Sequence, residues 1–399
     1  MRIVEATNRR AIERLLAPVA KDDTSFERRV RAIVEGVRAD GDRALERFAR
    51  RFDGASAPLE VSRAAIRAGA AQVPASVRRA IGTAADNIAR VAFRQIPRHL
   101  DISVAPGVSV EQRVEPLVRV GCYVPGGRFP LPSSLLMTAV PARVAGVREI
   151  IAVCPRPEPV VMAAAEEAGV TRLFRIGGAH AVAALAYGTR TVPRVDKIVG
   201  PGNRYVAAAK AMVASACAID FYAGPTEIVV VAGSGRPAWI AADLVAQAEH
   251  DPDARTTFIT WNRQLASRVA KAVTTTRGII IITRSADEAM ALANRLAPEH
   301  LVVDRESLVK RPLTAGAVFV GAYSAQAAGD YATGSNHVLP TAGAARCRGG
   351  LSAADFVRVM SVQRITRSGL ARLSSTILPL ARAEGLEAHA KSIEIRLRH

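Results

Sequence analysis

The hydrophobic positions of the first hundred residues recur at helical spacing. Apolar residues repeat every three or four positions through residues 26–38, a run that Ser25 can cap, and again through residues 75–94. From about residue 8 to residue 98 we therefore predict helices.

After residue 108 the pattern changes to short apolar runs of strand length that alternate with helical stretches. Such alternation is typical of a parallel sheet with helices on its faces. The triplet Ala-Gly-Val, at 145–147 and at 168–170, twice ends a helix and begins a strand, which is a weak internal repeat. The predicted strands are 108–114, 117–123, 149–153, 172–176 and 197–199, and the predicted helices are 133–144, 160–168 and 180–187.

The same alternation begins again after the turn at residues 223–225. The tail from about residue 353 has a helical pattern and ends in an apolar-alternating strand candidate at 393–397. The second series has predicted strands at 227–232, 256–260, 278–283 and 316–320, and predicted helices at 239–249, 263–273 and 287–296.

These patterns predict an α/β protein with two doubly wound, Rossmann-like domains with parallel-rich sheets, a helical N-terminal segment and a small C-terminal tail domain. A chain of 399 residues is long enough for several cores. We assign an N-terminal helical arm to 1–24, a discontinuous first α/β domain to 25–122 and 226–350, a second α/β domain to 123–225 and the tail to 351–399.

Composition favours a soluble protein. The longest apolar runs, at 228–232 and 279–282, are too short to span a bilayer, and residues 1–6 lack the apolar core of a secretory signal. The four cysteines form no CxxC pair, so we interpret them as ordinary thiols. We expect a cytoplasmic protein with no membrane partner.

The formal charge of +18 raises the question of nucleic-acid binding. Arginines are interleaved with acidic residues, as in residues 28–42, and aromatic residues make up only 5% of the chain, so few bases could stack on them. We interpret the charge as a solvated surface and expect no nucleic-acid partner. The field could still attract anionic ligands such as a dinucleotide.

Histidine is concentrated in polar segments. The chain has seven histidines, and histidine is the residue for metal ligation and for proton transfer near neutral pH. One assembled site is therefore a better interpretation than scattered surface residues. Four of the seven lie beside Gln, Glu or Asp in the segments 247–250, 297–300, 329–337 and 386–389.

Three of these segments suggest metal ligands. Gln247 and His250 lie three apart on a predicted helix, and an amide oxygen with an imidazole suits zinc. Asp330 and His389 could complete four ligands. The Gln-x-x-His pair by itself also occurs on ordinary helix faces.

The fourth segment, 297–300, suggests acid–base chemistry. Glu299 and His300 precede an apolar strand, where a carboxylate and an imidazole could serve two proton transfers, one for a substrate and one for a water. The alternative is a polar turn with a satisfied histidine.

Glycine turns follow several predicted strands, where α/β sheets bind ligands. The turns at 123–127 and 200–203 lack the GxGxxG fingerprint, and residues 233–238 match only a GxGxxA variant. They could approach a phosphate or simply be tight turns.

Seven stretches together resemble the histidinol dehydrogenase family, in order and over nearly the whole chain. They are Tyr-Val-Pro-Gly-Gly at 123–127, Pro-Ser-Ser-Leu-Leu-Met at 132–137, Val-Asp-Lys-Ile-Val-Gly-Pro-Gly-Asn at 195–203, Ala-Gly-Pro-Thr-Glu at 223–227, Gln-Ala-Glu-His-Asp-Pro at 247–252, Pro-Glu-His-Leu at 298–301, and the run from Gly329 to Thr341. The joint match favours the functional interpretation of each motif over the ordinary one.

The resemblance implies oxidation of L-histidinol through the aldehyde to L-histidine with reduction of two NAD+, the last steps of histidine biosynthesis. It implies His300 as the base that removes the alcohol proton and Glu299 as the group that activates the water adding to the aldehyde. The metal would hold the substrate's imidazole and amine. The zinc ligands that it implies, one ion per subunit, are Gln247, His250, Asp330 and His389.

Further contacts are implied by motif matching. Members of the family are homodimers with intertwined tails, so His389 could come from the same chain or across the subunit boundary. Besides the zinc ligands and His300, the implied substrate contacts are Thr226, His337 and Glu384. The implied NAD contacts, in the second α/β domain, are Tyr123, His180 and Asn203.

The chain departs from the family pattern in three places. Most members have Gln in place of His180 and Ser in place of Thr226, and the chain is short between residues 273 and 278. The extra methyl group of Thr226 could narrow the substrate pocket. Two alternatives therefore stay open: a paralogue oxidising another small polar alcohol, and a metal-dependent, non-enzymatic binder of imidazole compounds, against which Glu299 and His300 argue.

Overall fold

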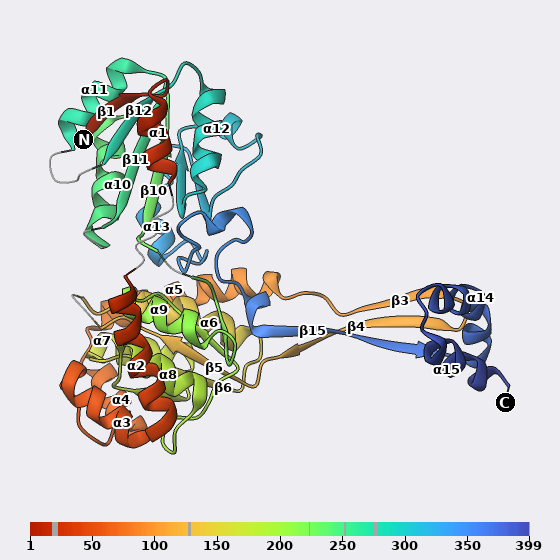
Figure 1. Cartoon of the computed structure of the whole chain (residues 1–399). Coiled ribbons are helices and arrows are strands. Elements are labelled where there is room, and N and C mark those ends of the chain that lie inside the picture. The colour runs from red at the N-terminus through yellow and green to blue at the C-terminus, as the bar shows by residue number, and fades with distance from the viewer. Residues whose placement is uncertain (18–22, 127–128, 223, 251–252, 274–277, 399) are drawn as a thin grey trace. The chain divides into compact units, whose positions relative to one another are not determined.

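Two six-stranded sheets organise most of the chain (Figure 1). The computed structural model describes residues 1–17, 23–126, 129–222, 224–250, 253–273 and 278–398, with the backbone alone at His250. Motif positions 127, 223 and 251–252, and the shortened stretch at 274–277, lie outside the described residues.

By its contacts the chain divides into two units. The larger unit comprises Met1–Arg94 and Val118–Phe356, and the smaller comprises Gln95–Leu117 and Val357–His399. The smaller unit therefore contains a segment from the middle of the chain as well as the C-terminal tail.

The first sheet, sheet A, is wholly parallel. Its strands lie in the order β1 (Arg2–Glu5), β12 (Ile279–Ile282), β11 (Arg255–Thr260), β10 (Glu227–Val231), β13 (His300–Val303) and β14 (Ala317–Val320). Helices α10 (Pro237–His250) and α11 (Arg263–Ala272) cover one face, α1 (Arg9–Leu16) and α12 (Ala286–Leu296) cover the other, and η2 (Glu306–Leu308) and α13 (Gln326–Tyr331) follow β13 and β14.

Both faces of sheet A are apolar, as a parallel sheet between helices requires. Ile228 and Val230 of β10 pack with α10 and α11, whereas Val229 and Val231 pack with α1 and α12. Continuous Val and Ile runs in the sequence therefore become two separate cores.

The second sheet, sheet B, is parallel except at its β2 edge. Its strands lie in the order β2 (Glu60–Val61), β7 (Arg172–Phe174), β6 (Glu149–Val153), β5 (Arg119–Tyr123), β8 (Lys197–Val199) and β9 (Ala218–Ile219). One face packs with α2 (Thr24–Asp40), α3 (Asp42–Phe48), α8 (Gly178–Tyr187) and α9 (Arg204–Val213). Helix α6 (Pro132–Val144) packs on β5 and β6 and against α7 (Pro159–Ala168), which contacts α4 (Arg63–Ala71). The remaining helical elements of the larger unit are η1 (Ala49–Asp53), α5 (Ala75–Gln95), η3 (Ala344–Arg346) and η4 (Ala353–Phe356).

The two parallel-rich, doubly wound sheets confirm the predicted fold class. The division of the chain between them differs from the predicted one, because β5 pairs with β6 and β8, β2 pairs with β7, and α2 packs against α8. The structure differs from the assignment of 25–122 to the domain of residues 226–350, because β2 and β5 of this segment belong to sheet B, α2 and α3 pack on that sheet, and residues 95–117 belong to the smaller unit. The arm at 1–24 also begins with a strand, because Val4 is buried and β1 pairs with β12. Periodicity shows that a strand exists but does not identify its partner.

Local differences have local causes. Asp23, in place of Ser25, caps α2, because its Oδ1 accepts the Phe26 N–H at 2.9 Å. The strand candidate at 393–397 is instead the end of a helix, since five alternating residues are too few to establish a period.

The smaller unit contains an antiparallel sheet of β15 (Val357–Ile365), β4 (Val108–Pro116) and β3 (Leu100–Ala105), and a pair of packed helices, α14 (Arg367–Ala383) and α15 (Glu387–Leu397). The tail was predicted to be helical from residue 353; after the short η4 it instead continues as the strand β15, and its two long helices follow. Apolar side chains on its strands, such as Ile102, Val104 and Val359, are at least half exposed.

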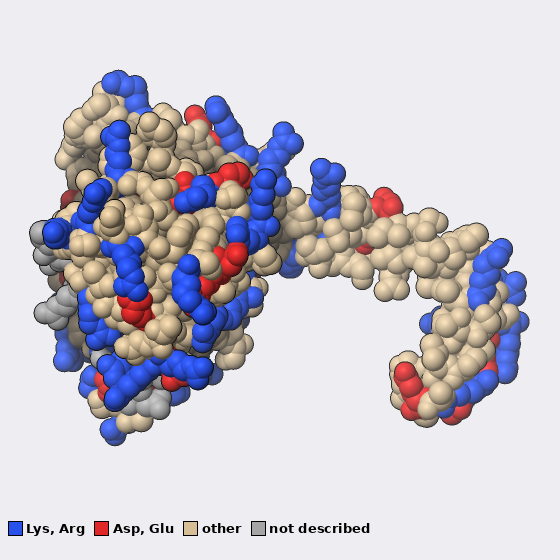
Figure 2. All heavy atoms as spheres, turned by 90° about the horizontal axis from the view of Figure 1, so that it is seen from above, with Lys and Arg blue, Asp and Glu red and all other residues tan. Residues whose placement is uncertain are grey.

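The distribution of charged residues on the surface agrees with their interleaving in the sequence. On the face drawn in Figure 2, Lys and Arg are spread among other residues and interleaved with Asp and Glu. Among the described residues, every helix is too short or too polar to cross a bilayer. The cysteines are free thiols, three of them buried and Cys347 exposed.

Candidate active site

Three of the predicted residues meet at the amino edge of sheet A, the edge where its parallel strands begin. Thr226 directly precedes β10, Glu299 directly precedes β13, and His300 is the first residue of β13. Because β10 and β13 are neighbours, with Ile228 opposite His300, the start of each strand presents its polar side chains to the other.

Hydrogen bonds join Thr226 to two of the predicted site residues. The Thr226 hydroxyl donates to Glu299 Oε2 and accepts from Gln247 Nε2. The N–H of Glu227 donates to the same Glu299 oxygen at 2.9 Å. The side-chain amide of Gln247 is fully buried, and its Oε1 has no hydrogen-bond partner among the described residues. An orphaned amide oxygen of this kind is available to a cation or a substrate donor.

Burial raises the pKa of Glu299 to about 8. The hydrogen bonds from Thr226 and from the Glu227 N–H oppose this shift, whereas the nearby carboxylates of Glu227 and Asp330 add to it. A carboxyl group with a pKa in this range exchanges protons near neutral pH, which suits acid–base work.

Hydrogen bonding sets the tautomer of His300. Its ring is buried, with Nδ1 3.2 Å from the Glu227 carbonyl oxygen and Nε2 3.3 Å from Gln326 Nε2. A carbonyl oxygen can only accept, so Nδ1 carries the proton and donates to it. Nε2 then carries the lone pair of the ring, with which it accepts a hydrogen bond from the Gln326 amide. His300 is therefore arranged as a base at Nε2.

Gln326 is a site residue that the sequence analysis missed. It opens α13, is 1% exposed, and its Nε2 also donates to Asp330 Oδ2 at 2.8 Å. Its spacing of four from Asp330 on one helix was the signal that could have identified it. Gln326 links the predicted base to a predicted zinc ligand.

His337 lies beside Asp330 and α6. Its Nδ1 is 3.0 Å from the Asp330 carbonyl oxygen, to which it donates, and its Nε2 is 3.5 Å from Ser134 Oγ. The neighbouring Asn336 donates to the Met137 carbonyl at 2.6 Å. These bonds hold the 330–337 segment against the first turns of α6.

The predicted zinc ligands are brought together in part. Gln247 and Asp330 each connect to the Glu299–His300 pair, the first through Thr226 and the second through Gln326. His250 ends α10, one turn beyond Gln247, but its side chain is not described, and His389 lies on α15 of the smaller unit, as Glu384 lies at the end of α14. Within the described residues, His, Cys, Asp and Glu side chains form no cluster of three or more that could hold a metal. The donor set fits zinc through the free Gln247 oxygen and the Asp330 carboxylate.

The predicted NAD contacts gather at the opposite kind of edge, where the strands of sheet B end. Tyr123 ends β5, and Gly200 follows β8, the neighbouring strand at which the order of the sheet reverses. Gly200 has a φ of 114°, and a Cβ there would collide with the carbonyl oxygen of Tyr123. The side chain of Asn203 caps α9 by accepting the N–H groups of Tyr205 and Val206. A glycine turn at a switch point fits a dinucleotide.

His180 and Tyr123 are both buried, 1% and 3% exposed, whereas Asn203 is exposed. Its Nε2 donates to Asp53 Oδ2 at 2.8 Å, and the same oxygen accepts the Gly177 N–H at 2.9 Å. The Gly178 N–H donates to the Tyr123 hydroxyl at 3.0 Å. His180 thus braces the loop behind Tyr123.

In the GxGxxA variant at residues 233–238, which follows β10 of sheet A, a carboxylate of the protein binds the backbone N–H groups of the turn. Asp304 Oδ2 accepts the N–H groups of Gly233 and Ser234 at 2.9 and 3.1 Å, together with the Ser234 hydroxyl. These N–H groups are the donors that a phosphate would need, and a carboxylate of the chain itself already takes them. The weak motif is therefore a structural turn.

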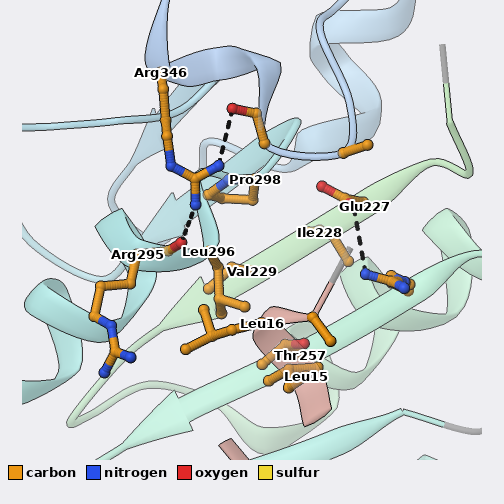
Figure 3. Close-up of a pocket in the computed structure, with 14 residues that line it drawn as sticks. Leu15, Leu16, Glu227, Ile228, Val229, Thr257, Arg295, Leu296, Pro298 and Arg346 are labelled. Atoms are coloured by element: carbon orange, nitrogen blue, oxygen red, sulfur yellow. Dashed lines mark hydrogen bonds and ion pairs between the residues drawn. The ribbon is translucent and has the colours of Figure 1, made fainter. Parts of the chain in front are cut away.

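A pocket of roughly 310 Å³ lies beside the candidate site. Figure 3 shows Arg346 bonded to the carbonyl of Arg295. The Glu227 carboxylate lies 3.9 Å from Arg255. Glu227 and Pro298 belong to its lining, whereas the predicted site residues with described side chains do not. The pocket and the hydrogen-bonded cluster are therefore neighbouring features, and Glu227 belongs to both.

Comparisons with known proteins show which family the chain is similar to. Residues 17–397 match the family described as histidinol dehydrogenase. The chain is 47% identical to the histidinol dehydrogenase of Syntrophotalea carbinolica, with 96% of each chain covered, and 45% identical to that of Thermus thermophilus, with 94% and 95% covered. A crystal structure of histidinol dehydrogenase from Elizabethkingia anophelis superposes with a TM-score of 0.94 at 31% identity, covering 100% of this chain and 98% of that one.

Proposed function

We propose that this chain, which belongs to the histidinol dehydrogenase family, oxidises L-histidinol through L-histidinal to L-histidine with two NAD+, the final steps of histidine biosynthesis. The observation that carries the proposal is the convergence of Thr226, Glu299 and His300 beside the unpartnered oxygen of Gln247. Two proton-transfer groups next to a cation ligand serve an oxidation that needs a base and an activated water.

In the first oxidation His300 Nε2 accepts the proton of the alcohol. NAD+, when bound, would supply the acceptor for the hydride. The Nδ1–H bond to the Glu227 carbonyl keeps the ring in the basic tautomer and stabilises the imidazolium that forms. Because Gln326 Nε2 donates to the same nitrogen, the substrate hydroxyl must replace or share that bond.

In the second oxidation Glu299 takes a proton from the water that adds to the aldehyde. Its raised pKa makes the ionised carboxylate a stronger base than an exposed one, and Thr226 and the Glu227 N–H direct one of its oxygens. The other carboxylate oxygen is left for the water.

Zinc held by Gln247, His250, Asp330 and His389 would supply a Lewis acid that orients the imidazole and amine of the substrate. Thr226, His337 and Glu384 would contact the substrate. Because the Thr226 hydroxyl donates its hydrogen bond to Glu299, Thr226 would act mainly by orienting that carboxylate.

NAD would bind at the carboxyl edge of sheet B, against Tyr123 and Asn203. The burial of His180 favours an indirect part, in which it holds the Gly177–Gly178 loop for the cofactor. We further propose a cytoplasmic homodimer with exchanged smaller units, which brings Glu384 and His389 to the site. The half-exposed apolar side chains on the strands of the smaller unit support this exchange.

The decisive experiment is the stoichiometry of NADH formation with L-histidinol, compared with a panel of other small alcohols. Two NADH per histidinol, with histidine as the product, is the expected result. Turnover of another alcohol with no reaction of histidinol would identify a paralogue. Binding of imidazole compounds without NADH formation would identify a non-enzymatic binder.

A further inference from the structure

Lys210 and Asp220 form an enclosed ion pair beneath the turn at Gly200, and the proposed chemistry uses neither residue. Lys210 lies on α9 and Asp220 directly follows β9, and they are 2% and 4% exposed. Removing two charges from water is costly, and a buried pair often adds no more stability than apolar residues would. The pair therefore needs an explanation other than stability.

Both polar groups of one backbone residue are held by this pair. The Gly200 N–H donates to Asp220 Oδ2 at 2.8 Å, and Lys210 Nζ donates to the Gly200 carbonyl oxygen at 3.1 Å. Lys210 also donates to Asp220 Oδ1, which accepts the Phe221 N–H at 2.7 Å. Gly200 is thus fixed at its N–H and at its C=O by side chains that are themselves bonded together.

The held residue occupies a conformation that other residues rarely adopt. With φ at 114°, Gly200 lies directly against the carbonyl oxygen of Tyr123, and the α9 cap Asn203 follows three residues later. The buried Tyr123 and the exposed Asn203 are the two positions at this edge that are proposed to contact NAD. Fixing Gly200 therefore fixes the spacing between them.

We propose that Lys210 and Asp220 are positioning residues for the dinucleotide, which preorganise the Gly200 turn so that little order has to be gained on binding. The inference rests on the proposed function, because it takes NAD as the ligand of this edge. A residue that acts in this way changes cofactor affinity and leaves alcohol binding alone.

The test is the double substitution Lys210→Met with Asp220→Asn, which removes both charges and so leaves neither one buried without its partner. We expect the Kd for NADH, measured by fluorescence titration of the zinc-loaded enzyme, to rise about tenfold, the effect of one or two lost hydrogen bonds. The KM for NAD+ rises with it, and the KM for histidinol stays within about twofold.

A matched control is available at the other edge of the same sheet. Arg119 and Glu149 form a bidentate pair, with Nε 2.8 Å from Oε2, where β5 and β6 begin. The double substitution Arg119→Met with Glu149→Gln removes a pair of equal charge far along the strands from Gly200, and we expect NADH affinity to be unchanged.

The outcomes separate the inference from the function. Failure of the unaltered protein to bind NADH overturns the proposed function and this inference with it. Normal NADH binding by the unaltered protein and by the folded Lys210/Asp220 variant overturns the inference alone, as does an equal loss of affinity for NADH and histidinol. Should the double variant not fold, Gly200→Ala tests the same turn with the pair intact, and unchanged NADH affinity in that variant has the same meaning.

Discussion

Sheet A and sheet B have the same strand order around their first strands but use opposite edges. Counted from β10 and from β5, both sheets run third, second, first, fourth, fifth. The residues proposed for NAD lie where the strands of sheet B end, whereas Thr226, Glu299 and His300 lie where strands of sheet A begin.

The difference has a visible cause at the carboxyl edge of sheet A. There the Asp304 carboxylate accepts the N–H groups of Gly233 and Ser234. A side chain of the protein therefore occupies the position that would bind a phosphate in a doubly wound sheet. In sheet B the turn after β8, the fourth strand by the same count, has Gly200 held in place by the side chains of Asp220 and Lys210. The comparison teaches that shared topology supplies two equivalent edges, and that a few polar side chains decide which one carries chemistry.

Removal of the metal should have the largest effect, because it should affect catalysis at the amino edge of sheet A and leave NADH binding at the carboxyl edge of sheet B unchanged. Chelation is expected to abolish turnover, because the substrate loses its anchor beside Gln247 and Asp330, and added zinc should restore it. NADH binding at sheet B should survive, and fluorescence titration of the chelated protein checks this. Full activity in protein that elemental analysis shows to be free of metal would contradict the assignment.

The next largest effect is expected at the base. His300→Asn should lower kcat by roughly 10²–10⁴-fold, the range for loss of a general base. The KM for histidinol and the Kd for NADH should change little, since the ring is proposed to act on a proton. Steady-state kinetics with His99→Asn as a control, a half-exposed histidine of the smaller unit, measures this. Near-normal turnover of His300→Asn would remove His300 from the mechanism.

The raised pKa of Glu299 predicts a dependence of stability on pH. In the folded protein burial lifts this pKa to about 8, and the unfolded group titrates near 4.5. Between these values the folded state keeps a proton that the unfolded state has lost, so the contribution of this group to the free energy of unfolding falls as pH rises. The slope cannot exceed about 1.4 kcal/mol per pH unit. Denaturant titrations of metal-free protein at pH 5 to 8 should show this fall, and Glu299→Gln should flatten it; identical profiles would disprove the shift.

The smallest functional effect is expected at the carboxyl edge of sheet A, where Asp304 accepts the N–H groups of Gly233 and Ser234. Asp304→Asn leaves an amide that can accept fewer of the bonds from Gly233 and Ser234, so we expect a loss of about 1–3 kcal/mol in the free energy of unfolding. NADH affinity and kcat should not change, because this turn binds no cofactor. A weaker NADH complex in this variant would mean that the carboxyl edge of sheet A takes part in cofactor binding after all.

The sequence by itself determined the elements and much of the chemistry. Continuous apolar runs such as 228–231 and 279–282 are typical of strands that are buried on both faces, and glycines after the strands mark turns. The local pattern alone therefore predicted two parallel-rich sheets. The motifs also placed Glu299 and His300 at a strand start. Resemblance to the family then supplied the roles that spacing could not.

Only the tertiary structure decided which segments belong together and which edge of each sheet is used. The pairing of β5 with β6 and β8 and the orphaned Gln247 oxygen depend on hydrogen bonds between residues distant in the chain, as does the tautomer of His300 between Glu227 and Gln326. A pattern of period two or 3.6 records which face of an element is apolar. It contains no information about the partner that each buried polar atom finds, and that partner sets the chemistry.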